Sequence, residues 1–315
     1  MSTNEKNRIS VDVIIPTYQP GAEFAKLLRS LALQVLLPDN IFIVNTEEKY
    51  WDERFTADMP NCTVMHISKE EFNHGASRHM AAMRSQADIL VFMTQDAMPA
   101  DKYLLKELTA PIMEKKAVVS YARQLPREHA TLLESYTRNF NYPPESMIKS
   151  KNDLGRLGIK TYFCSNVCAA YDHRVYDEMG GFPRPVILNE DMIMAANVIQ
   201  AGYNVACEAK AKVIHSHSYG ARKQFSRNFD IGVSQAMCPE IFDACPSVGE
   251  GTKLVKQSAK YVCKKRKYYL LFSLVWQSGW KFLGYSMGKR YKKLPEGLVK
   301  KWSDSPGFWN LKGEK

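Results

Sequence analysis

Three sets of polar side chains in this chain have types and spacings that suit chemistry. The first is a lone carboxylate just past an apolar run, the second is an adjacent pair of carboxylates, and the third is two histidines separated by one residue. Carboxylates and imidazoles hold divalent cations, and imidazoles also suit an anionic phosphate. In chain order these residues are Asp96, Glu190 with Asp191, and His215 with His217.

Asp96 follows a short apolar run, residues 89–93, that has the length of a buried strand and not of a helix. In open α/β sheets the ligand crevice lies beyond the carboxyl ends of the strands. This carboxylate is therefore placed to face a ligand or a cation. An aspartate after a strand is, however, often only a cap for the next helix.

Glu190 and Asp191 open a predicted helix that ends at Gly202. Carboxylates in a first turn complement the helix dipole, so capping alone would account for the pair. His215 and His217 fall in a strand-like run, residues 213–219, where residues two apart share a face. Two imidazoles on one face suit a metal or an anionic phosphate as readily as they suit a structural role.

An alternation of strands and helices must position these side chains. The apolar patterns predict helices at 22–36, 76–86 and 101–115, and a return to the sheet at 162–166. This alternation favours an α/β fold with a mostly parallel sheet, which would bring Pro16-Thr17, Asn45-Thr46 and Asp96 to one rim. Neither GxGxxG nor GxxxxGK[ST] occurs, so a nucleotide would be held by strand-end loops and a cation. The predicted strands are 11–15, 41–44, 63–67, 89–93 and 118–121.

The charge of the chain is concentrated at one end. Lysine and arginine number 43 against 33 aspartates and glutamates, a net charge of +10. The excess lies in residues 236–315, where there are 16 basic and 6 acidic residues. We therefore expect a catalytic domain at 1–235 and a basic helical region at 236–315.

Cysteine usage and hydropathy indicate in which cellular compartment the protein is expected. The seven cysteines are odd in number and lack CxxC spacing, which favours reduced thiols in a cytoplasmic protein. The first ten residues contain no apolar core of a secretory signal, and no run of 18 charge-free apolar residues predicts a membrane span.

Several ordered motifs resemble those of family 2 glycosyltransferases, which have the GT-A fold, a Rossmann-like sheet flanked by helices. They are Pro16-Thr17 after the first strand, Asp96 in TQDA, Glu190-Asp191 after a GGF turn, and a histidine in VIHSH. The stretches EFNHGASRHMAA, VFMTQDAMP, YARQLP, GIKTYFCSN and NFDIGV look like the bacterial branch that uses dTDP-L-rhamnose to build cell-wall or O-antigen polysaccharide. The likeness covers residues 11–235.

The resemblance implies an inverting transfer of L-rhamnose to a saccharide linked to polyprenyl diphosphate. Asp191 would be the general base, with Glu190 as the alternate. The usual DxD motif is reduced here to Gln95-Asp96-Ala97, so only one carboxylate of the motif remains. A family 2 transferase that uses a UDP-hexose donor is the alternative within the family.

The resemblance also implies two sets of binding residues. The cation would be Mn²⁺ or Mg²⁺ at the donor's diphosphate, with ligands Asp96, His215 and His217. The implied donor-binding residues are Pro16, Thr17, Tyr18, Asn45, Thr46, Glu47, Gly75, Arg78, Gln95, Asp96 and Ala97.

Residues 268–285 read YYLLFSLVWQSGWKFLGY, a predicted helix with a narrow polar stripe and a broad apolar surface. Basic clusters at 264–267 and 289–293 flank it. This pattern favours peripheral association with the inner face of an anionic plasma membrane. Packing against the body or in a homodimer is one alternative, and a nucleic-acid-binding module is another. Because the body is neutral and carries no nucleic-acid motif, we expect no nucleic-acid partner.

Overall fold

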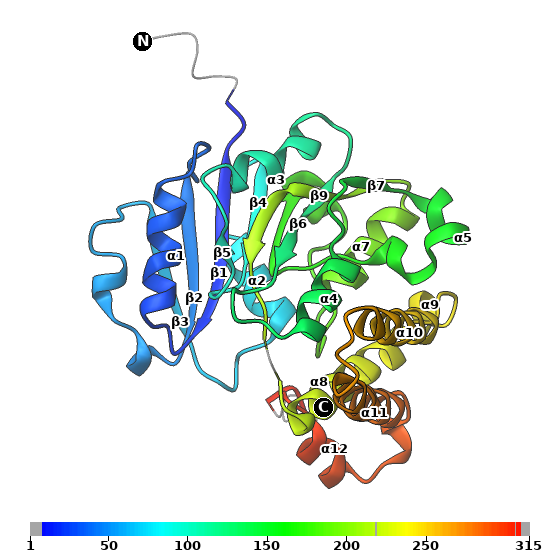
Figure 1. The fold of residues 1–315 in the computed structure, drawn as a ribbon. Coiled ribbons are helices and arrows are strands. Elements are labelled where there is room, and N and C mark those ends of the chain that lie inside the picture. Colours follow the sequence, from blue (N-terminus) through cyan, green and yellow to red (C-terminus); the bar gives the residue numbers. More distant parts are fainter. Residues whose placement is uncertain (1–7, 218, 306, 310–315) are drawn as a thin grey trace, which may run out of the picture.

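The computed structural model describes residues 8–217, 219–305 and 307–309. Its described part contains one nine-stranded sheet in the order β3-β2-β1-β4-β8-β6-β9-β5, with β7 paired to β9, and helices flank this sheet (Figure 1). The strands are β1 (Val11–Tyr18), β2 (Asn40–Thr46), β3 (Cys62–Ile67), β4 (Ile89–Met93), β5 (Met98–Pro99), β6 (Val119–Leu125), β7 (Met147–Lys149), β8 (Cys168–Asp172) and β9 (Val205–Ile214).

Two apolar cores form because alternate strand residues point to opposite faces of the sheet. In β1, Val13 and Ile15 join the core under α1 and α3, whereas Ile14 joins the core under α2, α6 and α7. The helices are α1 (Ala22–Ala32), α2 (His74–Ala82), α3 (Leu104–Met113), α4 (Leu132–Asn141), α5 (Leu154–Leu157), α6 (His173–Glu178), α7 (Glu190–Gln200), α8 (Ala221–Met237), α9 (Pro239–Phe242), α10 (Val248–Lys264), α11 (Leu270–Lys289) and α12 (Glu296–Trp302).

The sheet is mixed, although a mostly parallel one was predicted. Strands β1 to β4 pair in parallel, as expected. Strand β8 runs antiparallel between β4 and β6, and β5 and β7 run antiparallel to β9. The direction of a strand depends on where its connection re-enters the sheet, and hydropathy patterns do not encode this.

Several strand predictions were wrong at their boundaries, and two of them bear on the site. Residues 162–166 form the end of a 3-10 helix (Gly158–Tyr162) and a loop, and the strand begins only at Cys168. The aromatic residues there resemble a strand in sequence, but they fill the core from a turn. Strand β1 continues through Pro16 to Tyr18. Pairing with β4 stops at Ile14, so Pro16 lies beside β2 alone, at a position where the sheet has only one neighbour for β1.

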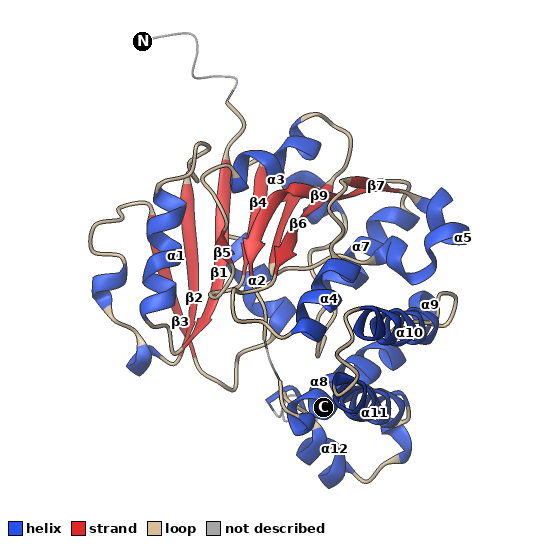
Figure 2. Cartoon of the chain, in the orientation of Figure 1, coloured by secondary structure: helices blue, strands red, loops and turns tan. Residues whose placement is uncertain are grey.

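The C-terminal helices form a separate layer below the sheet in Figure 2. Helices α8 and α11 pack so closely that a Cβ on Gly284 or Gly288 would collide with the carbonyl oxygen of Phe225 or Phe229. The expected domain boundary at residue 235 falls inside α8. Across the described residues, no helix has both the length and the apolar character needed to cross a bilayer. All seven cysteines are free thiols.

Candidate active site

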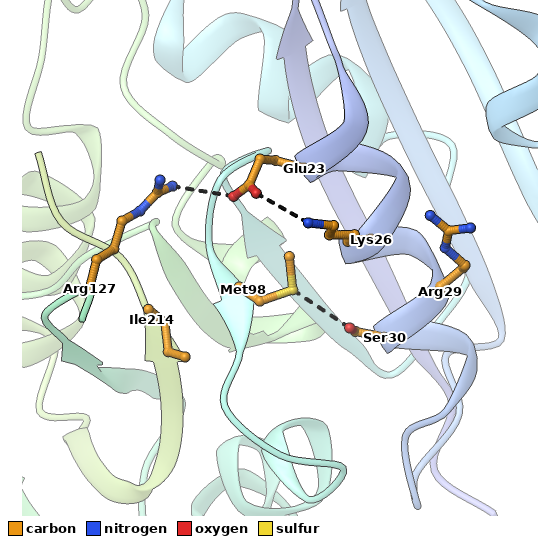
Figure 3. A pocket seen from close by; sticks show the side chains of 7 residues that line it. All are labelled: Glu23, Lys26, Arg29, Ser30, Met98, Arg127 and Ile214. Carbon is orange, nitrogen blue, oxygen red and sulfur yellow. Dashed lines mark hydrogen bonds and ion pairs between the residues drawn. The ribbon is translucent and has the colours of Figure 1, made fainter. Parts of the chain in front are cut away.

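A cavity of about 500 Å³ lies between α1 and the ends of β5 and β9 (Figure 3). Met98 and Ile214 line it, and they lie close in the chain to Asp96 and His215. Basic side chains surround it, and one carboxylate, Glu23, lies 3.7 Å from both Lys26 and Arg127. The cavity therefore adjoins the loops that carry the predicted metal ligands.

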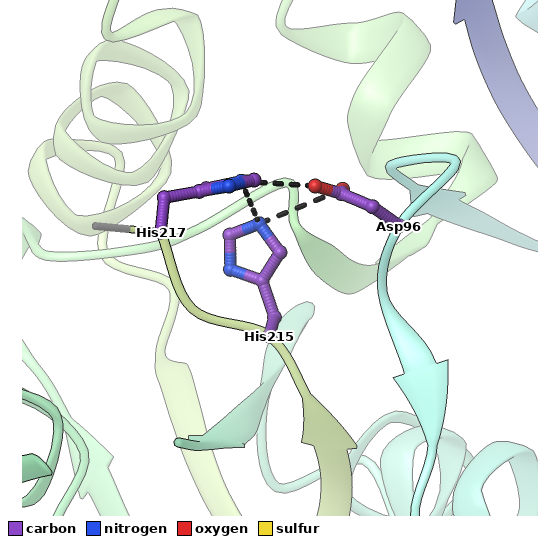
Figure 4. A group of neighbouring side chains, drawn as sticks. All are labelled: Asp96, His215 and His217. Carbon is purple, nitrogen blue, oxygen red and sulfur yellow. Dashed lines mark hydrogen bonds and ion pairs between the residues drawn. The ribbon is translucent and has the colours of Figure 1, made fainter. Parts of the chain in front are cut away.

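The carboxylate predicted to face a cation lies beside both histidines (Figure 4). Asp96 Oδ1 is 3.5 Å from His215 Nε2, and Asp96 Oδ2 is 2.9 Å from His217 Nε2. The two Nε2 atoms are 3.1 Å apart. Ligand atoms from two loops thus converge beyond the carboxyl ends of β4 and β9, in an arrangement that could hold a divalent cation.

The histidines reach this point from a loop, and not from one face of a strand as predicted. Strand β9 ends at Ile214, and Ser218 of the predicted strand lies outside the described residues. Strand alternation therefore does not orient the two rings. The ring of His217 stacks on that of Tyr219 at 5.1 Å and meets the ring of His215 edge-on at 4.7 Å.

The tautomer of His215 suits metal binding. Its Nδ1 lies 3.0 Å from Gln124 Oε1, and the guanidinium of Arg138 donates to the same oxygen. Because Oε1 can only accept, His215 donates from Nδ1, so Nε2 is the nitrogen that faces Asp96 and that the neutral ring would offer to a cation. Gln124 and Arg138 therefore orient a predicted ligand from outside the metal site.

The electrostatics of the cluster also favour a cation. Burial opposes ionisation of Asp96, but hydrogen bonds from His215 and His217 outweigh it and hold the pKa of Asp96 well below its usual range. Burial lowers the pKa of His215. An ionised carboxylate and a neutral imidazole are the protonation states that bind metal.

The carboxylate pair is divided between two environments. Glu190 is 4% exposed, and its Oε1 accepts from Arg78 Nη1 at 2.9 Å and from Asn166 Nδ2 at 3.2 Å. Despite burial, the cation of Arg78 lowers the pKa of Glu190. Glu190 is therefore an ionised partner in a buried ion pair.

Asp191 has the opposite character. Its Oδ2 accepts from the backbone N–H of Asn166 at 3.0 Å. Burial and the adjacent charge of Glu190 raise the pKa of Asp191 to about 7. A carboxylate with a pKa near neutrality is a stronger base than an ordinary aspartate, so it suits proton abstraction at physiological pH.

One tripeptide, residues 165–167, joins the two halves of the site. Ser165 Oγ accepts from Gln124 Nε2 at 3.0 Å, and Gln124 holds His215. The N–H of Asn166 binds Asp191, and the carbonyl of Val167 accepts from the N–H of Thr94 at 3.1 Å, at the start of the turn that carries Asp96. The candidate base and the candidate metal ligands therefore share one support.

The predicted donor-binding residues of the first two strands do meet at one rim. Thr17 and Asn45 are adjacent in the parallel register of β1 and β2, and Thr17 Oγ1 donates to Asn45 Oδ1 at 3.1 Å. Thr46 is buried, and its Oγ1 has no hydrogen-bond partner among the described residues. Thr17 and Asn45 are the second-last residues of their strands and Thr46 is the last, so all three lie within the strands and do not follow them as predicted. Pro16 belongs to the same strand end.

Gln95, the residue in place of the first aspartate of DxD, ties β1 to the turn after β4. Its Oε1 accepts from the N–H of Tyr18 at 2.9 Å, and its Nε2 donates to the carbonyl of Tyr18 at 3.0 Å. A carboxylate could not donate to that carbonyl. The two hydrogen bonds to Tyr18 therefore explain why glutamine, and not aspartate, occupies position 95. Ala97, in the same turn, is fully buried.

The remaining predicted donor-binding residues already have partners within the chain. Glu47 accepts from the N–H of Lys69 at 2.8 Å. Gly75 lies so close to the loop before α7 that a Cβ would come within 2.8 Å of the carbonyl oxygen of Pro183. Arg78 is 4% exposed and pairs with Glu190. Contact of these residues with a donor stays a prediction.

Sequence reasoning missed Gln124, Arg138 and Asn166 as residues of the site. Gln124 and Arg138 lie 91 and 77 positions before His215, in β6 and α4, and no spacing pattern links them to it. Asn166 belongs to the stretch 162–166, which the sequence predicted as a strand and not as part of the site.

Comparison with known proteins identifies the family. The model of glycosyl transferase family 2 matches residues 12–180. The O-antigen chain rhamnosyltransferase RfbN of Salmonella typhimurium is 38% identical over 304 residues, 96% of each chain. WbaN of Salmonella anatum, which has the same description, is 39% identical over the same shares.

Solved structures agree in fold. The mannosyltransferase PcManGT from Pyrobaculum calidifontis, in complex with GDP-Man and Mn²⁺, has a TM-score of 0.56 at 14% identity, covering 98% of this chain and 87% of that one. TarS 1-349 from S. aureus has a TM-score of 0.53 at 15% identity, covering 90% and 91%. The predicted GT-A fold is confirmed, and the chain is a glycosyltransferase that belongs to family 2.

Proposed function

We propose that this enzyme transfers L-rhamnose from dTDP-β-L-rhamnose, with inversion, to a saccharide linked to polyprenyl diphosphate. The relatives named as O-antigen chain rhamnosyltransferases support the sugar, since they align over nearly the whole chain. The observation that carries the mechanism is the shared support of Asp191 and the Asp96 cluster by residues 165–167.

The residues present fit a divalent cation, because one ionised carboxylate oxygen and two imidazole nitrogens converge. Asp96, His215 and His217 would hold Mn²⁺ or Mg²⁺, with the diphosphate oxygens of the donor completing the shell. When bound, the ion supplies Lewis-acid neutralisation of the charge that develops on the departing diphosphate.

Asp191 takes the proton of the acceptor hydroxyl. At the same time, the oxygen of that hydroxyl attacks the anomeric carbon of the donor. The new carbon–oxygen bond forms on the face opposite the breaking bond to the phosphate oxygen, whose electron pair leaves with dTDP. One displacement inverts the anomeric centre, so a β-linked donor gives an α-L-rhamnoside. Gln124 and Arg138 keep His215 oriented, and Arg78 keeps Glu190 ionised and out of the reaction.

The donor sugar is tested by incubating the enzyme with Mn²⁺ and single nucleotide sugars. We expect release of dTDP from dTDP-β-L-rhamnose at a rate well above that of release of UDP from UDP-glucose or UDP-galactose. A buried site built for one donor rejects another by leaving polar groups unpaired, which can reach a factor of ~10⁴. Faster turnover of a UDP-hexose would replace the proposed donor with that sugar.

We also assign the exposed face of α11 to an anionic membrane. Phe272, Val275 and Trp276 are 78%, 69% and 54% exposed on this helix. The basic clusters 264–267 and 289–293 lie at its two ends. Apolar side chains with adjacent cations match an anionic lipid surface, where each basic residue contributes about 1 kcal/mol. A lipid-linked acceptor would then be presented where the enzyme binds.

Flotation with phosphatidylglycerol vesicles tests this surface. We expect the double variant Phe272→Ser with Trp276→Ser to partition at least about tenfold more weakly than the unchanged protein, since each buried aromatic contributes about 1.5–3 kcal/mol. Leu33→Ser, at a residue 74% exposed near the end of α1, is the control and should float normally. Equal flotation of the double variant contradicts the assignment. If the unchanged protein is a homodimer and the double variant is a monomer, this face of α11 binds a second copy of the chain and not a membrane.

A further inference from the structure

The narrow polar stripe of α11 faces the body of the protein. Its members, Ser273, Gln277 and Lys281, recur every four residues along the helix and are partly buried. The wide apolar surface points outward instead, and Phe272 and Trp276 are exposed on it. Helices of globular proteins usually place their apolar side chains inside and their polar ones outside, so this inverted arrangement calls for an explanation.

Lys281 lies on the face of α11 that packs against other helices. Seven residues before it, Leu274 joins a buried cluster with Leu133 of α4. Three residues after it, Gly284 lies against the backbone of Phe225 in α8. Residues three, four and seven apart share one face of a helix. Lys281 therefore lies along the seam where α11 meets α4 and α8.

Lys281 has no anionic partner among the described residues. The charged group that acts on it is Arg138 of α4, which is a second cation. Burial and this positive charge lower the pKa of Lys281. Both side chains are only partly buried, so an ion from solution can reach them. Because two neighbouring cations without a carboxylate repel each other, an anion between them would be bound favourably.

Arg138 connects this seam to the candidate metal site. Helix α4 lies between the sheet and helices α10 and α11 (Figure 1). The Nη1 atom of Arg138 donates to Gln124 Oε1, which also accepts from Nδ1 of His215. The other ring nitrogen of His215, Nε2, is the one that faces Asp96. Arg138 is therefore behind the predicted metal ligands, on the side away from Asp96.

The groups along the seam suit a phosphate-type anion. The guanidinium of Arg138 and the ammonium of Lys281 are donors that form charge-assisted hydrogen bonds to phosphate oxygens. Gln277 Nε2 donates to Ser273 Oγ at 2.9 Å, so neutral polar groups continue the stripe beyond the two cations. The opposite face of α11 is the one assigned above to an anionic membrane. A diphosphate that joins a sugar to a lipid has the charge and the membrane attachment that this seam would accommodate.

We propose that Arg138 and Lys281 bind the diphosphate that links the acceptor saccharide to its lipid. This second anion site is separate from the one at Asp96 for the diphosphate of the donor. The inference rests on the proposed function, which supplies the lipid-linked acceptor. Lys281 is then a binding residue for the acceptor, and Arg138 serves both sites because it also holds Gln124.

Isothermal titration of the enzyme with geranyl diphosphate, in the presence of Mn²⁺ and saturating dTDP, tests this site. Because dTDP occupies the donor site, the probe reports on the second one. We expect Lys281→Met to weaken binding of the probe at least about tenfold, since a charge-assisted hydrogen bond is lost, and Lys281→Arg to retain it. Lys253→Met is the matched control and should bind normally, because Lys253 of α10 already pairs with Glu250 at 3.6 Å.

The outcomes separate this site from other sources of phosphate and from the proposed function. Binding of geranyl diphosphate that is unchanged in Lys281→Met, or absent in the unchanged protein, overturns the assignment. If Lys281→Met then weakens only dTDP binding, the lysine belongs to the donor site. If it weakens only flotation with phosphatidylglycerol vesicles, the lysine binds lipid headgroups. Probe binding that depends on Lys281 supports the inference even if dTDP-rhamnose is not turned over, and the donor proposal then fails alone.

The stability of the same variant shows whether Lys281 has a structural role. Since Lys281 has no anionic partner among the described residues, Lys281→Met should unfold at the same denaturant concentration as the unchanged protein, or at a higher one. Unfolding at a lower concentration would mean that the ammonium group stabilises the fold, and it would contradict a site kept for a ligand.

Discussion

Asp191→Asn is expected to lower the rate of rhamnosyl transfer by about 10²–10⁴-fold while dTDP still binds. The loss is the contribution that a positioned general base makes to proton removal. Asparagine keeps the size of the side chain and an oxygen that can accept from the N–H of Asn166. Single-turnover rates and dTDP titrations, with the Asp177→Asn variant of an exposed aspartate as control, measure the two effects separately.

The pH profile provides a second readout of the same residue. The base must be ionised to act, and burial with the Glu190 charge raises the pKa of Asp191 to about 7. Transfer should therefore fall as the pH drops through neutrality, about tenfold per pH unit below that pKa. A flat profile between pH 5 and pH 7, or near-normal transfer by Asp191→Asn, removes Asp191 from the role.

Glu190, the alternate base, should behave differently. Its carboxylate and Arg78 are both buried, so Glu190→Gln leaves a buried guanidinium without its counter-ion. Breaking one side of such a pair costs about 3–5 kcal/mol in the free energy of unfolding. A denaturation curve should show that loss for Glu190→Gln and a much smaller change for Asp191→Asn. In the proposed mechanism Glu190 has the positioning role and Asp191 carries out the chemistry.

Asp96→Asn is the second substitution with a large expected effect. It removes the only carboxylate among the predicted ligands, so Mn²⁺ affinity and the rate of transfer should both fall. Stabilisation of a leaving diphosphate by a Lewis acid amounts to several kcal/mol, which corresponds to a rate loss on the order of 10²-fold or more. Electron paramagnetic resonance of free Mn²⁺ measures the affinity, and Asp58→Asn, at an exposed residue, is the control.

Metal removal from the unchanged enzyme should have the same result. EDTA is expected to stop formation of the rhamnoside, and added Mn²⁺ to restore it. Full activity in EDTA would mean that the two imidazoles, as cations, stabilise the diphosphate without a metal ion, and the metal assignment would be wrong.

Local sequence patterns pointed to Asp96, His215 and His217, but not to the residues that support them. The apolar run before Asp96 and the spacing of His215 and His217 depend on local patterns, and the structure brings these three side chains together. The supporting residues were not predictable in this way. Gln124 reaches His215 only because β6 and β9 are neighbours in the sheet, and that pairing follows from topology.

Local patterns failed where the tertiary structure overrides them. The stretch around Tyr162 has the composition of a strand, yet the ring fills the core from a 3-10 helix. The reason for glutamine at position 95 also appears only in three dimensions, since its amide bridges to the backbone of Tyr18. Arg78 and Glu190 are 112 positions apart, and their burial as a pair could not be inferred from either motif.

Anomalous diffraction from a crystal of the enzyme soaked with dTDP and Mn²⁺ tests the central claim most directly. We predict a manganese peak within bonding distance of Asp96, His215 and His217, with both phosphates of dTDP on its open side. A peak elsewhere, or dTDP bound away from this cluster, would contradict the account of how the donor is held and how its diphosphate departs.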